Sequence, residues 1–173
     1  MQLLLAPRAS KRLQRELRKA GRREIGGLLM GEHVADELFR VVEITVQRAG
    51  GTEACFIRRP DEHREQLLKF FADKGNDYSR FNYLGEWHSH PSFEPVPSDT
   101  DVRAMQSMVE DPEAGVNFLV LVVCKRAVSG SLEASATAFR ARSEPIAIPI
   151  ALDAGTGTQT PSLGQRFRRL IGF

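Results

Sequence analysis

The segment at residues 116–124 constrains the fold of this chain more than any other stretch of its sequence. It reads VNFLVLVVC and is the most apolar run in the chain. A short run that is apolar throughout is typical of a strand buried on both faces, in the middle of a sheet. Residues 116–124 therefore predict a central strand, with other elements covering each face of its sheet.

The rest of the chain supplies further strands and the covering helices. Apolar spacing, helix-start residues and glycine positions give the predicted boundaries. Helices are predicted at residues 8–20, 61–74 and 98–110, and strands at 24–31, 37–46, 54–57, 81–88 and 130–140, with a last edge segment at 145–150. Gly26 and Gly27 lie inside a strand pattern and indicate close approach of another backbone. The predicted fold class is α/β (α+β), a central β-sheet flanked by helices.

Length and composition are those of one domain with a sizeable core: 173 residues, 42% hydrophobic and 27% charged. The net charge of +2 argues neither for nor against a nucleic-acid partner. No stretch approaches the ~18 apolar residues of a membrane span. The N-terminal apolar run is too short for a signal peptide. Cys55 and Cys124 do not form a disulfide framework or a CxxC pair, so we expect a reducing, cytoplasmic location.

The composition changes after Asp153. Residues 155–161 are rich in glycine and threonine and predict a flexible linker. Residues 163–173 carry three arginines and no acid among apolar side chains, which suits a short docking helix for this domain, for a partner or for a membrane surface. The predicted organisation is one domain at residues 1–153, followed by a linker and a short basic amphipathic tail at 154–173.

A cluster of metal-binding residue types follows the predicted strand at 81–88. His88 and His90 are two residues apart on an extended segment, so their imidazoles point to the same side. Asp101 follows eleven residues after His90, past a proline-rich turn. Two histidines and one carboxylate, with an open fourth position, are the ligands of a hydrolytic zinc site. The other two histidines, His33 and His63, are isolated and are predicted to be surface residues.

Ser98 and Asp101 also have a purely structural interpretation. Serine followed three residues later by an acid is a typical helix start, with Ser98 as the N-cap and Asp101 as its capping partner. A helix capped in this way would place Asp101 in its first turn, facing the end of the preceding strand. The same geometry therefore serves a cap and a metal ligand.

In combination these residues resemble the motif of a known family. His88-Ser89-His90-Pro91, then Ser98 and Asp101, is similar to the JAMM motif of the JAB/MPN+ metalloproteases. Glu24, which precedes the glycine-containing strand at 25–31, resembles the family's catalytic glutamate. The resemblance covers roughly residues 8–140. It implies an MPN/JAB-like domain with a mixed, curved sheet, and a peptidase domain at residues 1–153.

The resemblance also implies roles for individual residues. His88, His90 and Asp101 would hold one Zn²⁺ per chain. Glu24 would be the general base and would return the proton to the leaving amine. Ser98 would donate a hydrogen bond to the oxyanion of the tetrahedral intermediate. Trp87 is expected to belong to the core or the cleft wall rather than to the chemistry.

The implied activity is cleavage of peptide or isopeptide bonds after the C-terminus of a ubiquitin-like protein, whose tail would lie along the site as an added strand. Specificity would come from residues 47–80 and 92–97. The expected partners are the ubiquitin-like protein and its conjugates, with E1- and E2-like proteins of a bacterial conjugation or antiphage system, and no nucleic acid. The alternatives are processing of a sulfur-carrier protein, or a partner-binding MPN module without catalysis.

Overall fold

The computed structural model describes residues 1–48 and 61–154. The predicted strand at 54–57 and the predicted tail at 155–173 lie outside these residues. The helices are α1 (Pro7–Ala20), α2 (Asp61–Asp73), α3 (Asp99–Glu110) and the short 3-10 helix η1 (Pro112–Ala114). The strands are β1 (Gln2–Leu5), β2 (Gly26–Ala35), β3 (Leu38–Ile44), β4 (Phe81–Ser89), β5 (Leu119–Arg126), β6 (Leu132–Phe139), β7 (Ile146–Ile148) and β8 (Ile150–Leu152).

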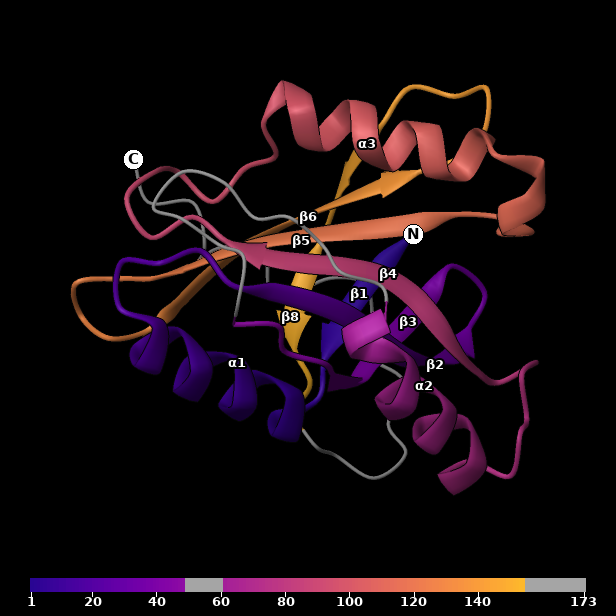
Figure 1. Ribbon diagram of the computed structural model, residues 1–173, viewed down its shortest axis with the longest axis horizontal. Helices are drawn as coiled ribbons and strands as arrows, with labels where there is room; N and C mark the ends of the chain where they lie inside the picture. The colour runs from indigo at the N-terminus through magenta and orange to yellow at the C-terminus, as the bar shows by residue number, and fades with distance from the viewer. Residues whose placement is uncertain (49–60, 155–173) are drawn as a thin grey trace.

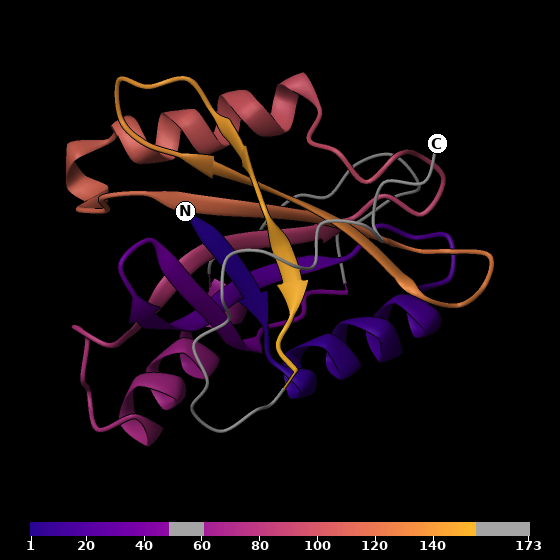
Figure 2. The same cartoon turned by 180° about the vertical axis from the view of Figure 1, so that it is seen from behind.

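These strands form one sheet in the order β7-β6-β5-β4-β2-β3-β1-β8. β4 and β5 are parallel, as are β1 and its neighbours β3 and β8, while the remaining pairs are antiparallel. β1 and β8 lie side by side and steeply inclined to β5 and β6 (Figure 2), which shows how strongly the sheet curves. The predicted mixed, curved sheet flanked by helices is confirmed.

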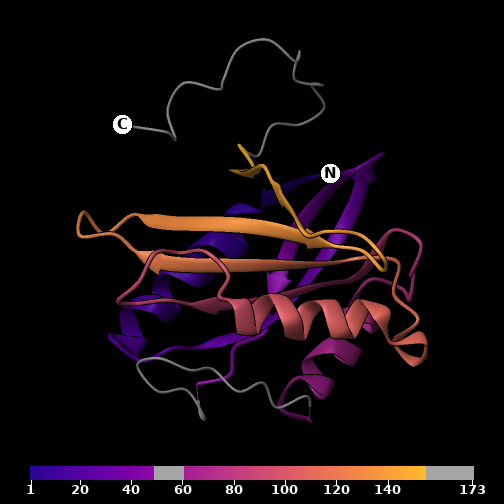
Figure 3. The same cartoon turned by 90° about the horizontal axis from the view of Figure 1, so that it is seen from above.

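β5 is the buried central strand that the apolar run predicts, although it begins at Leu119 rather than at residue 116. Alternate residues of β5 belong to different core clusters: Val120, Val122 and Cys124 to one, and Leu119, Leu121 and Val123 to the other. α1 contributes Ala9, Leu13 and Leu17 to the first cluster, and α3 contributes Met105 and Val109 to the second. The two helices therefore cover opposite faces of the sheet (Figure 1), and α3 runs beside the long β5–β6 pair (Figure 3).

The strands at the two edges of the sheet differ from those predicted from the sequence. β1 has only four residues, too few for a periodic pattern to emerge, and it forms only because β3 and β8 pair with it. The predicted edge segment at 145–150 is two strands, β7 and β8, on opposite edges of the sheet. Pro149 lies between them, and its carbonyl accepts a hydrogen bond from the Leu3 N–H at 2.9 Å. In the described residues no helix has the length and apolarity that a membrane crossing needs.

Gly27 confirms the prediction of close backbone approach. A Cβ atom on Gly27 would collide with the carbonyl group of Thr45. β2 therefore packs close against the chain that follows β3, where Gly26 forms a bridge with Gln47. This tight packing fixes the start of β2, which begins two residues after Glu24.

Candidate metal centre

The neighbouring strands β2 and β4 bring the candidate residues to one end of the sheet. In their antiparallel ladder Gly26 lies opposite His88. The start of β2 and the end of β4 are therefore adjacent, although Glu24 and His88 are far apart in the sequence. Glu24 is 4% exposed and His88 is 7% exposed. The pairing of β2 with β4 places a buried carboxylate beside the histidine segment.

The start of α3 supplies Asp101. Ser98 is the N-cap, its hydroxyl accepts a hydrogen bond from the Asp101 N–H at 3.3 Å, and the Asp101 carboxylate accepts one from the Ser98 N–H at 2.7 Å. The Ser98 hydroxyl also donates to Oδ2 of Asp101 at 2.7 Å. The predicted capping box is confirmed, and it holds the Asp101 carboxylate toward the end of β4.

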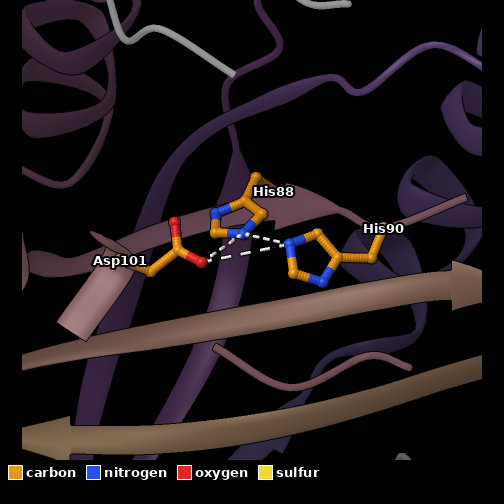
Figure 4. Close-up of side chains that lie close together, drawn as sticks. All are labelled: His88, His90 and Asp101. Carbon is orange, nitrogen blue, oxygen red and sulfur yellow. Dashed lines mark hydrogen bonds and ion pairs between the residues drawn. The ribbon is translucent and has the colours of Figure 1, made fainter. Parts of the chain in front are cut away.

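The three predicted ligands converge in space (Figure 4). Nε2 of His88 and Nε2 of His90 are 3.1 Å apart, and Oδ2 of Asp101 lies 3.5 Å from the first nitrogen and 3.9 Å from the second. A triangle with these sides has a circumradius of about 2 Å, which is the length of Zn–N and Zn–O bonds. Two neutral imidazoles and a carboxylate also suit zinc chemically. The residues therefore fit a metal ion such as Zn²⁺.

A backbone carbonyl orients one of these imidazoles. Nδ1 of His90 lies 3.1 Å from the carbonyl oxygen of Glu94. Because a carbonyl can only accept, Nδ1 carries the hydrogen, and the neutral ring has its lone pair on Nε2, which faces His88. The Glu94 side chain is paired with Nζ of Lys125 at 3.4 Å, which attaches the loop after His90 to β5. This is the outer support that metal-binding histidines require.

The two carboxyl groups of the site have opposite pKa shifts. Burial acts to raise the pKa of Asp101, but the hydrogen bond and charge of His88 and the hydrogen bonds from Ser98 outweigh it and hold that pKa well below its usual range. Burial raises the pKa of Glu24, with opposing effects from His90 and His88 and a further increase from Asp101. Asp101 is therefore suited to remain an anionic ligand, and Glu24 to exchange a proton.

Two further predictions concern residues near this site. Trp87 is fully buried in the core, where its Nε1–H donates to the Thr45 carbonyl at 2.9 Å, as expected of a core residue. The prediction for His33 is confirmed, since it is exposed and stacks on Phe39. The prediction for His63 is wrong: it is 1% exposed, and its Nδ1 lies 2.7 Å from Oγ1 of Thr45. α2 lies against β2 and β4 and brings this side chain to Thr45, a contact that the residue's position in the sequence does not reveal.

The sequence did not single out two supporting groups, Ser89 and the Glu94 carbonyl. Ser89 occupies the variable position of the histidine motif, and only the pairing of β4 with the chain before β2 shows what it contacts. A backbone carbonyl has no side-chain signature at all. The histidine motif and the proline-rich turn after it mark this region in the sequence, but neither identifies these two groups.

A cavity of about 830 Å³ lies away from the metal ligands. Its lining comes from α2, the start of β4 and the segment before β5, and includes Leu67, Phe71, Tyr83 and Phe118. His88, His90 and Asp101 do not line it, because they lie at the other end of β4 or on α3. The candidate metal centre therefore lies outside this cavity.

Known proteins resemble the chain in sequence and in fold. A protein described as "CD-NTase/cGAS isopeptidase" from Enterobacter hormaechei subsp. hoffmannii is 29% identical over 133 residues, which cover 76% of this chain and 71% of that protein. A protein of the same description from Vibrio cholerae serotype O1 is 30% identical over 105 residues, 60% of this chain and 63% of the relative. A solution structure of a protein from Desulfitobacterium hafniense matches 87% of this chain and 92% of its own, with a TM-score of 0.64 and 18% identity. That likeness shows the fold alone.

A family model for prokaryotic homologs of the JAB domain matches residues 7–141. The match contains Glu24, the histidine pair and the start of α3, and it ends where the sheet reaches its last short strands. It covers well over half of the chain. The protein therefore belongs to the prokaryotic JAB-domain family.

Proposed function

We propose that this protein is a zinc-dependent isopeptidase that acts on protein conjugates in a bacterial CD-NTase system. The observation that carries the proposal is the meeting of three ligand atoms within 4.8 Å of one another, with the buried carboxyl group of Glu24 in electrostatic range of all three residues. Membership of the JAB-domain family and two relatives described as isopeptidases support it.

His88, His90 and Asp101 would hold the metal. A zinc ion bound there would supply a Lewis acid for the substrate carbonyl and would lower the pKa of water to about 7. Glu24 takes a proton from the attacking water and delivers it to the leaving amine. The C–N bond of the substrate breaks and a C–O bond forms, so that hydrolysis yields a carboxylate and an amine. The raised pKa of Glu24 suits a group that must first accept this proton and then donate it.

Ser98 would stabilise the oxyanion through its hydroxyl group. In the structure this hydroxyl donates to Asp101, so it must turn away from the carboxylate to reach a substrate. The Ser98 N–H bonds the same carboxylate oxygen at 2.7 Å and would keep Asp101 in place during that rotation. The Ser98 hydroxyl can therefore turn away from Asp101 while the Ser98 N–H still holds that carboxylate.

For the substrate, we infer an isopeptide conjugate in which the C-terminal carboxyl group of one protein is joined to a lysine amine of another. The names of the two relatives make a CD-NTase the first candidate for a component of that conjugate, and a ubiquitin-like protein the second. A cytoplasmic location stays a prediction, and the free thiol of Cys124 is compatible with a reducing compartment.

The test is cleavage of defined conjugates by the zinc-loaded protein. A CD-NTase and a ubiquitin-like protein, each joined through its C-terminal carboxyl to a lysine side chain, are incubated separately, and the products are weighed by mass spectrometry. We expect release of the intact CD-NTase with one added water. No cleavage of either conjugate, or protein purified without chelator that holds no zinc, would contradict the proposal.

Glu24→Ala separates chemistry from metal binding. We expect this variant to keep about one zinc per chain and to lose about 10²- to 10⁴-fold in kcat, because the general base is gone while the ligands remain. Zinc content by atomic absorption and kcat on the cleaved conjugate are the two measurements. Wild-type kcat in Glu24→Ala would remove Glu24 from this role.

A further inference from the structure

Ser89 lies between the two histidine ligands, yet its side chain is not part of the metal cluster. It is the last residue of β4 and is fully buried. Its N–H donates to the carbonyl of Ile25 at 2.8 Å, and its hydroxyl oxygen accepts a hydrogen bond from the Ile25 N–H at 3.0 Å. Both bonds reach across to the residue that follows Glu24.

The hydroxyl takes the place of a missing backbone acceptor. Since Gly26 lies opposite His88, Ile25 lies opposite Ser89, where an antiparallel ladder would join the two residues by a pair of backbone hydrogen bonds. Only one of those bonds is present, and the second acceptor is Oγ of Ser89. On the other side of β4, the parallel pairing with β5 continues past Ser89, since the His90 N–H donates to the Cys124 carbonyl at 2.9 Å. Ser89 therefore keeps Ile25 hydrogen-bonded at the point where the backbone pairing of β4 with β2 ends.

The bond from Ile25 acts directly on Glu24. The N–H of Ile25 belongs to the planar peptide group that also contains Cα of Glu24. A hydrogen bond to this N–H therefore fixes the orientation of the peptide plane, and with it the direction in which the Glu24 side chain leaves the backbone. Ile25 is 2% exposed, so its N–H has little access to bulk solvent and loses its acceptor when the Ser89 hydroxyl is removed.

We propose that Ser89 is a positioning residue that ties the general base to the metal ligands. The proposal rests on the proposed function of Glu24. One residue, Ser89, is joined by peptide bonds to both histidines and by its hydroxyl to the peptide group of Glu24, so the base and the ligands keep a fixed mutual position. An error of about 1 Å in such a position can cost about 100-fold in rate.

Thr45 offers a matched control. Its hydroxyl is also fully buried and also accepts a hydrogen bond from a β2 backbone N–H, that of Leu28, at 2.8 Å. Thr45→Val therefore removes a comparable bond to the same strand, farther from Glu24, together with the contact between this hydroxyl and Nδ1 of His63. Ser89→Thr is the rescue variant, because it keeps the hydroxyl and because a cavity of about 40 Å³ borders Ser89 and can receive the added methyl group. Ser89→Cys keeps a side chain of the same shape but slightly larger, and it weakens the acceptor. It carries the same expectations as Ser89→Ala where the alanine variant does not fold.

The first experiment reads the position of Glu24 without any substrate. NMR of the labelled, zinc-loaded proteins follows the Ile25 amide and the side-chain carboxyl resonance of Glu24. In Ser89→Ala we expect the Ile25 amide to exchange at least about 10-fold faster and the Glu24 resonance to shift. Ser89→Thr should restore both, and Thr45→Val should leave the Glu24 resonance unchanged. An unchanged Glu24 resonance in Ser89→Ala, or loss of zinc from that variant, would overturn the proposal.

The second experiment separates kcat from KM on the conjugate that the wild type cleaves. Ser89→Ala should lower kcat about 10- to 100-fold and leave KM within about twofold, with zinc still bound. Thr45→Val should keep kcat within about twofold. An equal fall of kcat in Ser89→Ala and Thr45→Val would mean that Ser89 only stabilises β2 and does not position Glu24. A wild type that cleaves nothing would defeat the proposed function, while the NMR result would still decide the role of Ser89.

Discussion

Asp101 has two tasks at the first turn of α3. Its carboxylate caps the helix through the Ser98 N–H, and the same oxygen, Oδ2, faces the two histidine nitrogens. A capping carboxylate at a helix start is ordinarily a matter of stability alone. Here the cap fixes the direction of a proposed metal ligand, so helix formation and the geometry of the candidate site depend on the same atoms.

Substitution at Asp101 and Ser98 should separate these tasks. Each alanine variant loses part of the capping box, so we expect each zinc-free protein to lose about 1 kcal/mol of unfolding free energy. Asp101→Ala should also weaken zinc binding by more than about 100-fold, because a ligand is worth more than its outer supports. Ser98→Ala should weaken it by at most about 10-fold, since the Ser98 N–H still holds Oδ2.

Chelator competition measures the zinc affinity of each variant. Urea denaturation of the zinc-free proteins measures how much the cap contributes to the free energy of unfolding. Equal zinc loss in both variants would show that the cap, rather than the carboxylate ligand, dominates the site.

At the scale of elements, β2 joins the end of the sheet that carries the candidate metal centre to the opposite end. Its first residues lie against His88 and Thr45, and its last half carries Glu32, which accepts hydrogen bonds from Arg40 at 2.8 Å and from Arg80 at 2.6 Å. The strand is thus held by close packing at one end and by buried charge at the other.

Gly27→Ala tests the close packing. The new Cβ would collide with the Thr45 carbonyl, and overpacking of this kind should cost about 2–3 kcal/mol of unfolding free energy. Gly75→Ala is the control: Gly75 has a φ of 67° and no neighbour within 4 Å of an added Cβ, so only the backbone cost of about 1 kcal/mol is expected. Urea denaturation measures both changes in unfolding free energy. Equal losses in the two variants would mean that the backbone around Gly27 shifts to accommodate the added Cβ at little cost.

Glu32→Gln tests the buried charge. Burial acts to raise the pKa of Glu32, but hydrogen bonds from Arg80 and Arg40 outweigh it, so the folded-state pKa lies below the ordinary value of 4.5. The stabilisation is therefore complete above about pH 4.5 and is lost as the pH falls through the lower, folded-state value. At pH 7 the variant should be less stable than wild type by about 2 kcal/mol.

The difference in unfolding free energy between wild type and Glu32→Gln should shrink as the pH is lowered from 5 to 3. Urea denaturation across this range measures it. The pKa of Glu16 is lowered in the same direction, and because Glu16 is present in both proteins its effect cancels in the comparison. A stability difference that grows toward low pH would contradict a lowered pKa for Glu32 in the folded protein.

At the scale of the whole molecule, the curved sheet is completed by its shortest strands. β8 pairs with β1, the Asp153 N–H donates to the Leu5 carbonyl at 2.8 Å, and Oδ2 of Asp153 lies 2.7 Å from Nε of Arg40. β8 and Asp153, which make these contacts, lie beyond the matched family region at 7–141. The structural domain is therefore larger than the family match.

Two truncations test this boundary. Deletion of residues 155–173 should leave the thermal unfolding midpoint within about 1 °C and cleavage of the conjugate unchanged, because the described sheet is intact. Deletion of residues 150–173 removes β8 and exposes β1, and should lower the midpoint by at least about 5 °C. A fall in cleavage with the shorter deletion and an unchanged midpoint would assign the tail a role in substrate recruitment.

Several parts of the fold and site were predictable because their signals are local. The apolar run around Leu121 marks a strand buried on both faces, since a strand with one exposed face would show alternating polar residues. The spacing of His88 and His90 places both rings on one side of a strand, and Ser98 with Asp101 forms a helix cap within a single turn. Each of these inferences depends only on residues that are close in sequence.

The remaining features depend on contacts between distant segments. β1 exists because β3 and β8 supply its hydrogen bonds, His63 is buried because α2 packs against Thr45, and Ser89 contacts Ile25 because β2 and β4 are neighbours. Strand order is not encoded in any one window of sequence, since each strand exposes the same backbone donors and acceptors. The sequence by itself thus determined which residues can bind a metal. Only the tertiary structure decided that Glu24 and the histidines share one end of the sheet, because long-range pairing sets their distance.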